Sequence, residues 1–161
     1  MVVLIIDINI IKLGVIIMKL TNEVEYAFRI MFHLASASEG KVISSVEISN
    51  EEKVPHLFGL RILKKIENAG LVEVFKGAKG GYRLKKDSKK ISLKDIIEAI
   101  EDKMNITSGI AKKGYCSEKY EKSGIRKILT GIEKDFIKDL DSVNLYDIAE
   151  KSIIAKTKKK K

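Results

Sequence analysis

The spacing of apolar residues changes at Gly70, and this change limits what the chain can fold into. From Thr21 to Ala69 the apolar residues recur every three or four positions, which is the spacing of helices buried along one face. From Leu71 onwards, two short segments alternate apolar and polar side chains around a glycine-rich turn, as in a β-hairpin. The sequence therefore predicts a helical unit that ends in a two-stranded hairpin.

Local signals define three helices before the hairpin. The first is predicted over residues 22–37, with Thr21 as its N-cap and an apolar stripe wide enough to be buried on two sides. Ser44 and Glu47 form a capping box, which predicts a short second helix. A third helix is predicted over residues 55–69, because a proline suits its first turn and a glycine follows its end.

Helices also dominate the rest of the chain. Ser92 and Asp95 form another capping box, which begins a helix with several isoleucines on one face. Residues 105–122 show little periodicity, so we expect a loop, and residues 145–152 are consistent with a short last helix. Between them lies a long amphipathic helix whose apolar stripe consists of Ile125, Ile128, Leu129, Ile132, Phe136 and Leu140. The predicted fold class is mainly α with a small β-hairpin.

Positive charge is concentrated in one internal segment. The 161-residue chain has a net charge of +9, and residues 53–86 hold nine basic and two acidic side chains, a net charge of +7. Residues 87–154 hold thirteen of each sign, and the tail 155–161 adds five lysines and is expected to be disordered. This much localised basic charge indicates an anionic partner, most often nucleic acid.

Helix, short helix, tight break, helix and hairpin is the order of a winged helix-turn-helix, a DNA-binding architecture. On a helical wheel the third helix turns one side to the core, with Phe58, Ile62, Ile66 and Ala69. The other sides carry the candidate DNA-binding residues His56, Leu57, Leu60, Arg61 and Lys64. Arginine can read guanine, and an apolar side chain can contact a thymine methyl group. Taken alone, this helix is equally consistent with an ordinary solvated face.

The basic hairpin favours DNA over a solvated face. Its turn carries the candidate DNA-binding residues Lys76, Gly77 and Lys79, and its glycines, Gly80 and Gly81 included, let the backbone turn tightly and approach a phosphate. Such a hairpin lies along the minor groove, whose negative potential attracts cations. A nucleotide-binding loop is excluded, because no Gly-Lys-Ser/Thr motif is present. A winged-helix module that binds another protein is the alternative, although it does not need this charge.

A resemblance to a known family lies in three stretches: MKLTNEVEYAFRIMFHLA, VPHLFGLRILKKIENAGLVEVFKGAKGGYRLKK and ISLKDIIEAIED. They resemble the Rrf2 family of bacterial transcription regulators, which includes IscR, NsrR and CymR, and the similarity covers about residues 18–150. The resemblance implies a homodimer that binds double-stranded, palindromic operator DNA, for example as a repressor, with the 125–140 helix at the dimer interface. Leu57 and Leu60 occupy positions that are often polar in this family, so the operator sequence does not carry over.

The cysteine content departs from the iron–sulfur members of that family, which carry three cysteines in the loop before the dimer helix. This chain has one cysteine, Cys116. A cluster needs four ligands, usually thiolates, so we expect no iron–sulfur cluster and no other cofactor or metal. Cys116 is a candidate redox switch, because Lys112, Lys113 and Lys119 would favour its thiolate; a plain loop cysteine is the alternative.

No catalytic arrangement is apparent, so we expect no enzyme. His33 and His56 are far apart in the chain, and no Ser–His–Asp or Cys–His combination suggests itself. We interpret His33 as a partly buried helix residue. A single cysteine and the absence of a secretory signal favour the cytoplasm and no membrane partner.

The first seventeen residues are strongly apolar and have three interpretations. Met18 is the true start of the protein, or the segment is an added strand or helix, or it is a weak membrane anchor. The expected organisation is an N-terminal extension (1–17), a DNA-binding domain (18–86), a helical dimerisation and sensor region (87–154) and a basic tail (155–161).

Overall fold

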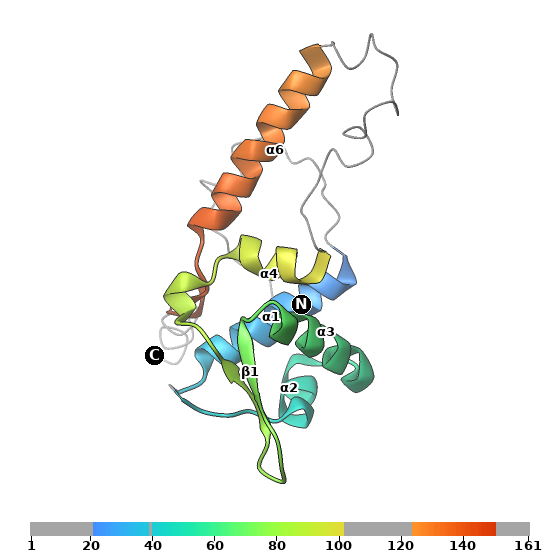
Figure 1. The fold of residues 1–161 in the computed structure, drawn as a ribbon, viewed down its shortest axis with the longest axis vertical. Helices are drawn as coiled ribbons and strands as arrows, with labels where there is room; N and C mark the ends of the chain where they lie inside the picture. The colour runs from blue at the N-terminus through green and yellow to red at the C-terminus, as the bar shows by residue number, and fades with distance from the viewer. Residues whose placement is uncertain (1–20, 39, 102–123, 151–161) are drawn as a thin grey trace, which may run out of the picture.

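The computed structural model describes residues 21–38, 40–101 and 124–150, and Figure 1 shows their arrangement. The predicted fold class is confirmed, because helices dominate and the two strands form one antiparallel hairpin. The elements are α1 (Asn22–Ser36), α2 (Ser45–Glu52), α3 (His56–Asn68), β1 (Val72–Phe75), β2 (Gly81–Leu84), the 3₁₀ helix η2 (Ser88–Lys90), α4 (Leu93–Glu101) and α6 (Gly124–Ser142). Residues 145–150 are also helical, at the place predicted for a last helix.

The predicted N-caps are present. Thr21 Oγ1 accepts a hydrogen bond from the Val24 N–H at 3.3 Å, and Ser44 Oγ accepts one from the Glu47 N–H at 3.1 Å. The expected reciprocal bond from Glu47 does not form, because its carboxylate pairs with Lys41 Nζ at 3.3 Å instead. The capping box at the start of α4 is complete in both directions.

Helix α1 lies at the centre of the fold and is buried on two sides, as predicted. It contacts α2, α3, α4 and β2, and its residues Val24, Ala27, Ile30 and Met31 are completely buried. The same hydrophobic core continues through α4 and reaches Leu145, which follows α6 in the chain. The helices on either side of residue 86 therefore share one core.

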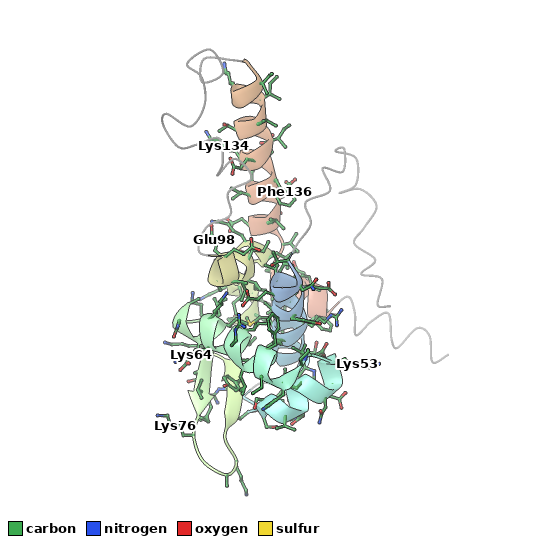
Figure 2. The ribbon with its side chains drawn as sticks, turned by 90° about the vertical axis from the view of Figure 1, so that its right-hand side faces the viewer. Lys53, Lys64, Lys76, Glu98, Lys134 and Phe136 are labelled. Atoms are coloured by element: carbon green, nitrogen blue, oxygen red, sulfur yellow. The ribbon has the colours of Figure 1, made fainter. Side chains whose placement is uncertain are left out.

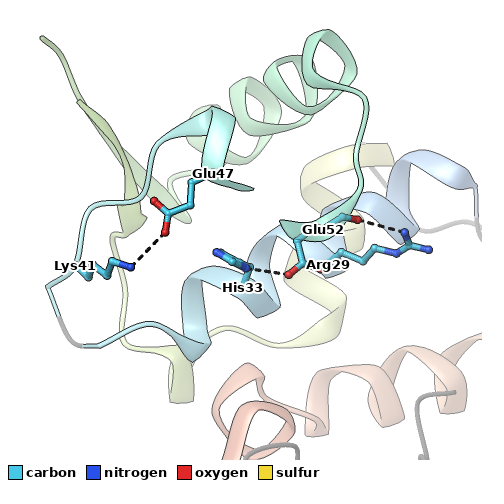
Figure 3. Close-up of polar contacts among 5 residues, drawn as sticks. All are labelled: Arg29, His33, Lys41, Glu47 and Glu52. Atoms are coloured by element: carbon cyan, nitrogen blue, oxygen red, sulfur yellow. Dashed lines mark hydrogen bonds and ion pairs between the residues drawn. The ribbon is translucent and has the colours of Figure 1, made fainter. Parts of the chain in front are cut away.

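Two side chains of α1 hold the C-terminal end of α2, as Figure 3 shows. His33 Nδ1 lies 2.9 Å from Glu52 Oε1, and Arg29 Nη1 donates to the Glu52 carbonyl oxygen at 3.5 Å. His33 is half-buried on α1, which confirms its interpretation as a partly buried helix residue. These contacts set the position of α2, the helix that precedes α3.

The hairpin is joined to the helical part by a bridge that the sequence did not predict. The Ile43 N–H donates to the Tyr82 carbonyl at 3.0 Å, and the Tyr82 N–H donates to the Ile43 carbonyl at 2.8 Å. This bridge needs a glycine beside it, since a Cβ at Gly81 would lie 2.3 Å from the Ile43 oxygen. Gly77 in the turn has a φ of +110°, which favours glycine.

Helix α6 is tied at its C-terminal end and rises away from the rest of the fold at its N-terminal end (Figure 1). The Leu93 N–H donates to the Val143 carbonyl at 3.0 Å, and the Leu145 N–H donates to the Ile91 carbonyl at 2.9 Å. Ser92 Oγ adds a bond to Asp141 Oδ1 at 3.3 Å. None of the helices in the described ranges has the length and hydropathy needed to cross a membrane.

Candidate nucleic-acid interface

Helix α3 buries one face and exposes four of its five residues predicted to contact DNA. His56, Leu57, Arg61 and Lys64 are exposed, Leu57 to 79%, and Leu60 is half-buried. The buried face consists of Gly59, Ile62, Leu63 and Ile66, with Phe58 partly buried against it. The prediction that Ala69 faces the core was wrong, because the helix ends at Asn68 and Ala69 is an exposed C-cap. Two further buried residues of α3 were not predicted: Gly59, which lies against Ser49 of α2, and Leu63, which lies in the core.

The Arg61 guanidinium lies over an aromatic ring, which in turn contacts a second ring. Its Cζ lies 5.2 Å from the centre of the Phe58 ring, and that ring meets Tyr26 of α1 edge-on at 5.7 Å. A guanidinium over an aromatic ring is attracted by the ring quadrupole, and the stem loses freedom before any ligand binds. Arg61 is therefore an exposed cation with a preferred orientation.

The hairpin turn carries Lys76, Gly77 and Lys79, all exposed. Figure 2 shows Lys76 on the hairpin and Lys64 on α3, on the same side of the molecule. Lys53, in contrast, lies on the other side in that view, at the end of α2. One predicted contact of α3 and one of the hairpin therefore lie on the same side of the molecule in this view.

Carboxylates neutralise three of the nine basic side chains in residues 53–86. Lys64 pairs with Glu67 at 2.8 Å, Lys65 with Glu23 at 2.8 Å, and Arg83 with Glu73 at 2.6 Å. Within the described part of the chain, no carboxylate partner is found for the other six, which are Lys53, Arg61, Lys76, Lys79, Lys85 and Lys86. Both acidic residues of the segment are thus already paired, and most of its positive charge faces solvent.

Arg83 links the two strands of the hairpin to each other and to the segment before α2. Its guanidinium holds Glu73 on the opposite strand, donates to the Gly40 carbonyl at 3.4 Å and lies 4.8 Å from the centre of the Phe75 ring. In the sequence, Arg83 stood out only as one of the nine basic residues of the segment 53–86. Its cross-strand spacing from Glu73 was a visible signal, because the predicted hairpin places the two residues opposite each other.

Tyr82 lies on β2 and is partly buried against the hydrophobic core. Burial raises the pKa of its phenol, the Glu67 carboxylate raises this pKa further, and the Lys64 ammonium opposes the rise. The phenol is therefore neutral at physiological pH. Tyr82 therefore adds no charge to the basic surface.

The beginning of α3 differs from the other capped helices. Its N-cap is Pro55, which has no side-chain acceptor, and its first turn holds no acidic residue. The first N–H groups of a helix attract anions when no side chain caps them. His56 is the first residue of α3, and its Nδ1 lies 3.2 Å from Ser49 Oγ on α2. Ser49 could not be predicted as part of the site, because nothing in the local sequence pattern connects it with His56.

The apolar stripe of α6, which was predicted as a dimer interface, is exposed at its N-terminal end and partly buried at its C-terminal end. Ile125 and Ile128 are 56% and 63% exposed, and Leu129 and Ile132 are half-buried. Phe136 and Leu140, nearer the tied end, pack partly against the core of their own chain. The N-terminal half of the stripe thus presents an apolar face. Cys116, the candidate redox residue, lies outside the described residues.

Comparison with known proteins identifies the family. The sequence model of the Rrf2 family, described as an iron-dependent transcriptional regulator, matches residues 20–151. This chain belongs to the Rrf2 family. Its residues 53–86, with α3 and the hairpin, lie entirely inside the match. The protein is therefore a transcriptional regulator and not an enzyme, in agreement with the sequence analysis.

Individual transcription regulators support this assignment. A Lactococcus lactis protein named as the HTH-type transcriptional regulator YffB is 29% identical over 139 residues, which are 84% of this chain and 89% of that protein. The structure of CymR (YrzC), the global cysteine regulator of B. subtilis, has a TM-score of 0.67 at 25% identity, over 82% of this chain and 96% of CymR. IscR of T. potens shares the fold, with a TM-score of 0.67 at 22% identity over 83% of this chain and 88% of that one. The expected winged-helix fold is confirmed.

The family description names iron, but the donor atoms of this chain do not fit an iron–sulfur cluster. Such a cluster takes four ligands, usually thiolates, and the whole sequence contains one cysteine. Among the described residues, no group of three or more His, Cys, Asp or Glu side chains is placed to hold a metal ion. We therefore derive no function through iron.

Proposed function

We propose that this Rrf2-family regulator binds double-stranded DNA sequence-specifically, with α3 in the major groove and the hairpin along the adjacent minor groove. The observation that carries the proposal is the set of cations without carboxylate partners on α3 and the hairpin, beside an α3 start that no side chain caps. Arg61 and Leu57 are exposed where a recognition helix reads base edges, and Lys76 and Lys79 are exposed where a wing meets phosphates. Residues 18–86 act as the DNA-binding domain, and the protein works in the cytoplasm.

We further propose that two copies bind together on a palindromic operator. The exposed isoleucines of α6 support this, because an apolar stripe on a projecting helix is stabilised by a second copy of itself. A two-fold symmetric pair would present two α3 helices about one DNA turn apart. Residues 87–154 then act as the dimerisation region.

Salt dependence tests the DNA-binding proposal. A duplex of random sequence is titrated with protein at several salt concentrations, because each phosphate neutralised contributes about −0.9 to the slope of log affinity against log salt. Lys76→Ala with Lys79→Ala should flatten that slope and weaken binding to all sequences alike.

The matched control changes Lys134 and Lys138 to alanine, which removes the same charge from exposed positions on α6 (Figure 2 labels Lys134). This control should bind like the wild type. If the wild-type protein does not bind random DNA even at low salt, the proposal is wrong and a protein-binding role of the winged-helix domain is favoured.

A further inference from the structure

Ser49 and His56 join the two helices of the helix-turn-helix. Ser49 lies on α2 and is only 9% exposed, whereas His56, at the start of α3, is exposed. Ser49 Oγ and His56 Nδ1 are 3.2 Å apart. One turn along α3, a Cβ built on Gly59 would lie 3.5 Å from Ser49 Oγ, so this hydroxyl is enclosed between the helices.

The buried hydroxyl favours one of the two tautomers of a neutral His56 ring. A buried O–H group needs an acceptor for its hydrogen, and in the described part of the chain the side-chain contact of Ser49 Oγ is His56 Nδ1. A hydroxyl hydrogen donated to Nδ1 leaves the hydrogen of the neutral ring on Nε2. Nε2 is the ring nitrogen that this contact with Ser49 does not occupy, and the His56 side chain is exposed to solvent.

We propose that Ser49 is a positioning residue, which holds the exposed His56 ring so that its Nε2–H donates to a DNA phosphate oxygen. This inference rests on the proposed DNA-binding function. A phosphate is favoured over a base because His56 lies on the side of α3 that faces α2, and the helix before a recognition helix crosses the DNA backbone. The start of α3, without a side-chain cap or an acidic residue, favours an anion at the same place.

A double-mutant cycle on random-sequence duplex DNA tests the coupling. His56→Ala should weaken binding about tenfold, as expected when a hydrogen bond to a charged group is lost. Ser49→Ala should weaken it about threefold, because the ring keeps its donor but loses its fixed orientation. The double variant should bind no more weakly than His56→Ala, because Ser49 acts only through His56.

Two substitutions of His56 separate its two nitrogens. In His56→Gln the amide nitrogen reaches the position of Nε2, whereas in His56→Asn the side chain reaches only as far as Nδ1. The Gln variant should therefore keep most of the affinity for DNA, and the Asn variant should resemble His56→Ala. Equal losses in the two variants would contradict a contact through Nε2.

Nitrogen NMR of the histidine rings tests the positioning without DNA. The chain has two histidines, so His33, hydrogen-bonded to Glu52, is an internal control. In the wild type, the His56 ring should show the Nε2–H form, and Ser49→Ala should mix the two forms while the His33 signals stay unchanged. A wild-type His56 ring that carries its proton on Nδ1 would overturn the inference.

The outcomes separate this inference from the function on which it rests. If the wild type does not bind DNA at low salt, the proposed function fails. If the wild type binds and Ser49→Ala weakens binding equally in the presence and absence of the His56 side chain, the positioning role fails and DNA binding stands.

Discussion

Arg61 and Lys64 lie on the exposed side of α3, but their surroundings differ. Lys64 is paired with Glu67 one turn away, and exposed pairs of this kind contribute only about 0.2–0.5 kcal/mol. Lys64 can therefore exchange its partner for a phosphate at little cost. Arg61 lies over the Phe58 ring and has no carboxylate partner among the described residues. A supported, planar guanidinium suits the two-point recognition of guanine.

The first prediction concerns specificity. Arg61→Ala should reduce the affinity for an operator selected from a random library by about 1–3 kcal/mol, because the bidentate contact to a guanine is lost. The loss on scrambled DNA should be far smaller, since only a phosphate-strength contact disappears there. Both duplexes are measured by titration at one salt concentration.

Lys76→Ala is the comparison for Arg61→Ala, because it should weaken both duplexes alike. Equal losses on operator and scrambled DNA for Arg61→Ala would make Arg61 a phosphate contact. The base-reading role would then pass to Leu57, Leu60 or Lys64.

At the scale of the elements, the hairpin depends on contacts with the segment between α1 and α2. The Ile43–Tyr82 bridge pairs the segment before α2 with β2. The Arg83 guanidinium, also on β2, donates to the Gly40 carbonyl of the same segment. These two contacts therefore help to fix the orientation of the hairpin relative to α3. Since both α3 and the hairpin are proposed to bind one DNA duplex, this orientation matters for affinity.

The second prediction is that Gly81→Ala destabilises the fold. The new Cβ would lie 2.3 Å from the Ile43 carbonyl oxygen, and a backbone atom cannot swing aside as a side chain can. The free energy of unfolding, measured by urea titration, should fall by about 1–3 kcal/mol.

Gly131→Ala provides the matched control for this substitution. Gly131 lies within α6 and a Cβ there meets nothing within 4 Å, so alanine should stabilise the helix by about 0.5–1 kcal/mol. A Gly81→Ala variant as stable as the wild type would show that the bridge can shift without cost.

At the scale of the whole molecule, the two ends of α6 have different surroundings. Its C-terminal end is fixed to the start of α4 through Ser92 and the backbone bonds of Leu93 and Leu145. Its N-terminal half presents exposed isoleucines. A second copy docked on that half would therefore be held in a defined orientation relative to α3.

The third prediction concerns assembly. Ile128 is 63% exposed, so Ile128→Glu should leave the fold of the single chain intact while it places a charge in the proposed interface. Sedimentation at micromolar concentration should give a dimer for the wild type and a monomer for this variant. The variant should also lose most of its operator affinity, because the two half-sites are no longer bound together.

Lys134→Glu is the control for assembly, since it adds a carboxylate to an exposed position of α6 outside the apolar stripe. This variant should remain dimeric. A wild-type protein that sediments as a monomer would contradict the proposed interface.

Much of the fold and part of the candidate site could be predicted from the sequence. The N-caps at Thr21 and Ser44, the glycine after α3 and the hairpin turn depend on residues only a few positions apart. The exposed positions of Leu57 and Arg61 follow from the helical period alone. Such features are readable without a structure, because short separations along the chain imply proximity in space.

Tertiary structure decided the features that depend on distant residues. The pairing of Ser49 with His56, the Ile43–Tyr82 bridge beside Gly81 and the neutralisation of Lys65 by Glu23 all join different elements. The folded structure also decides which of the nine basic side chains of residues 53–86 have a carboxylate partner. The linear sequence determines the type, period and ends of each element, whereas the packing of elements around the core determines which polar groups meet, because those distances exist only after the chain has folded.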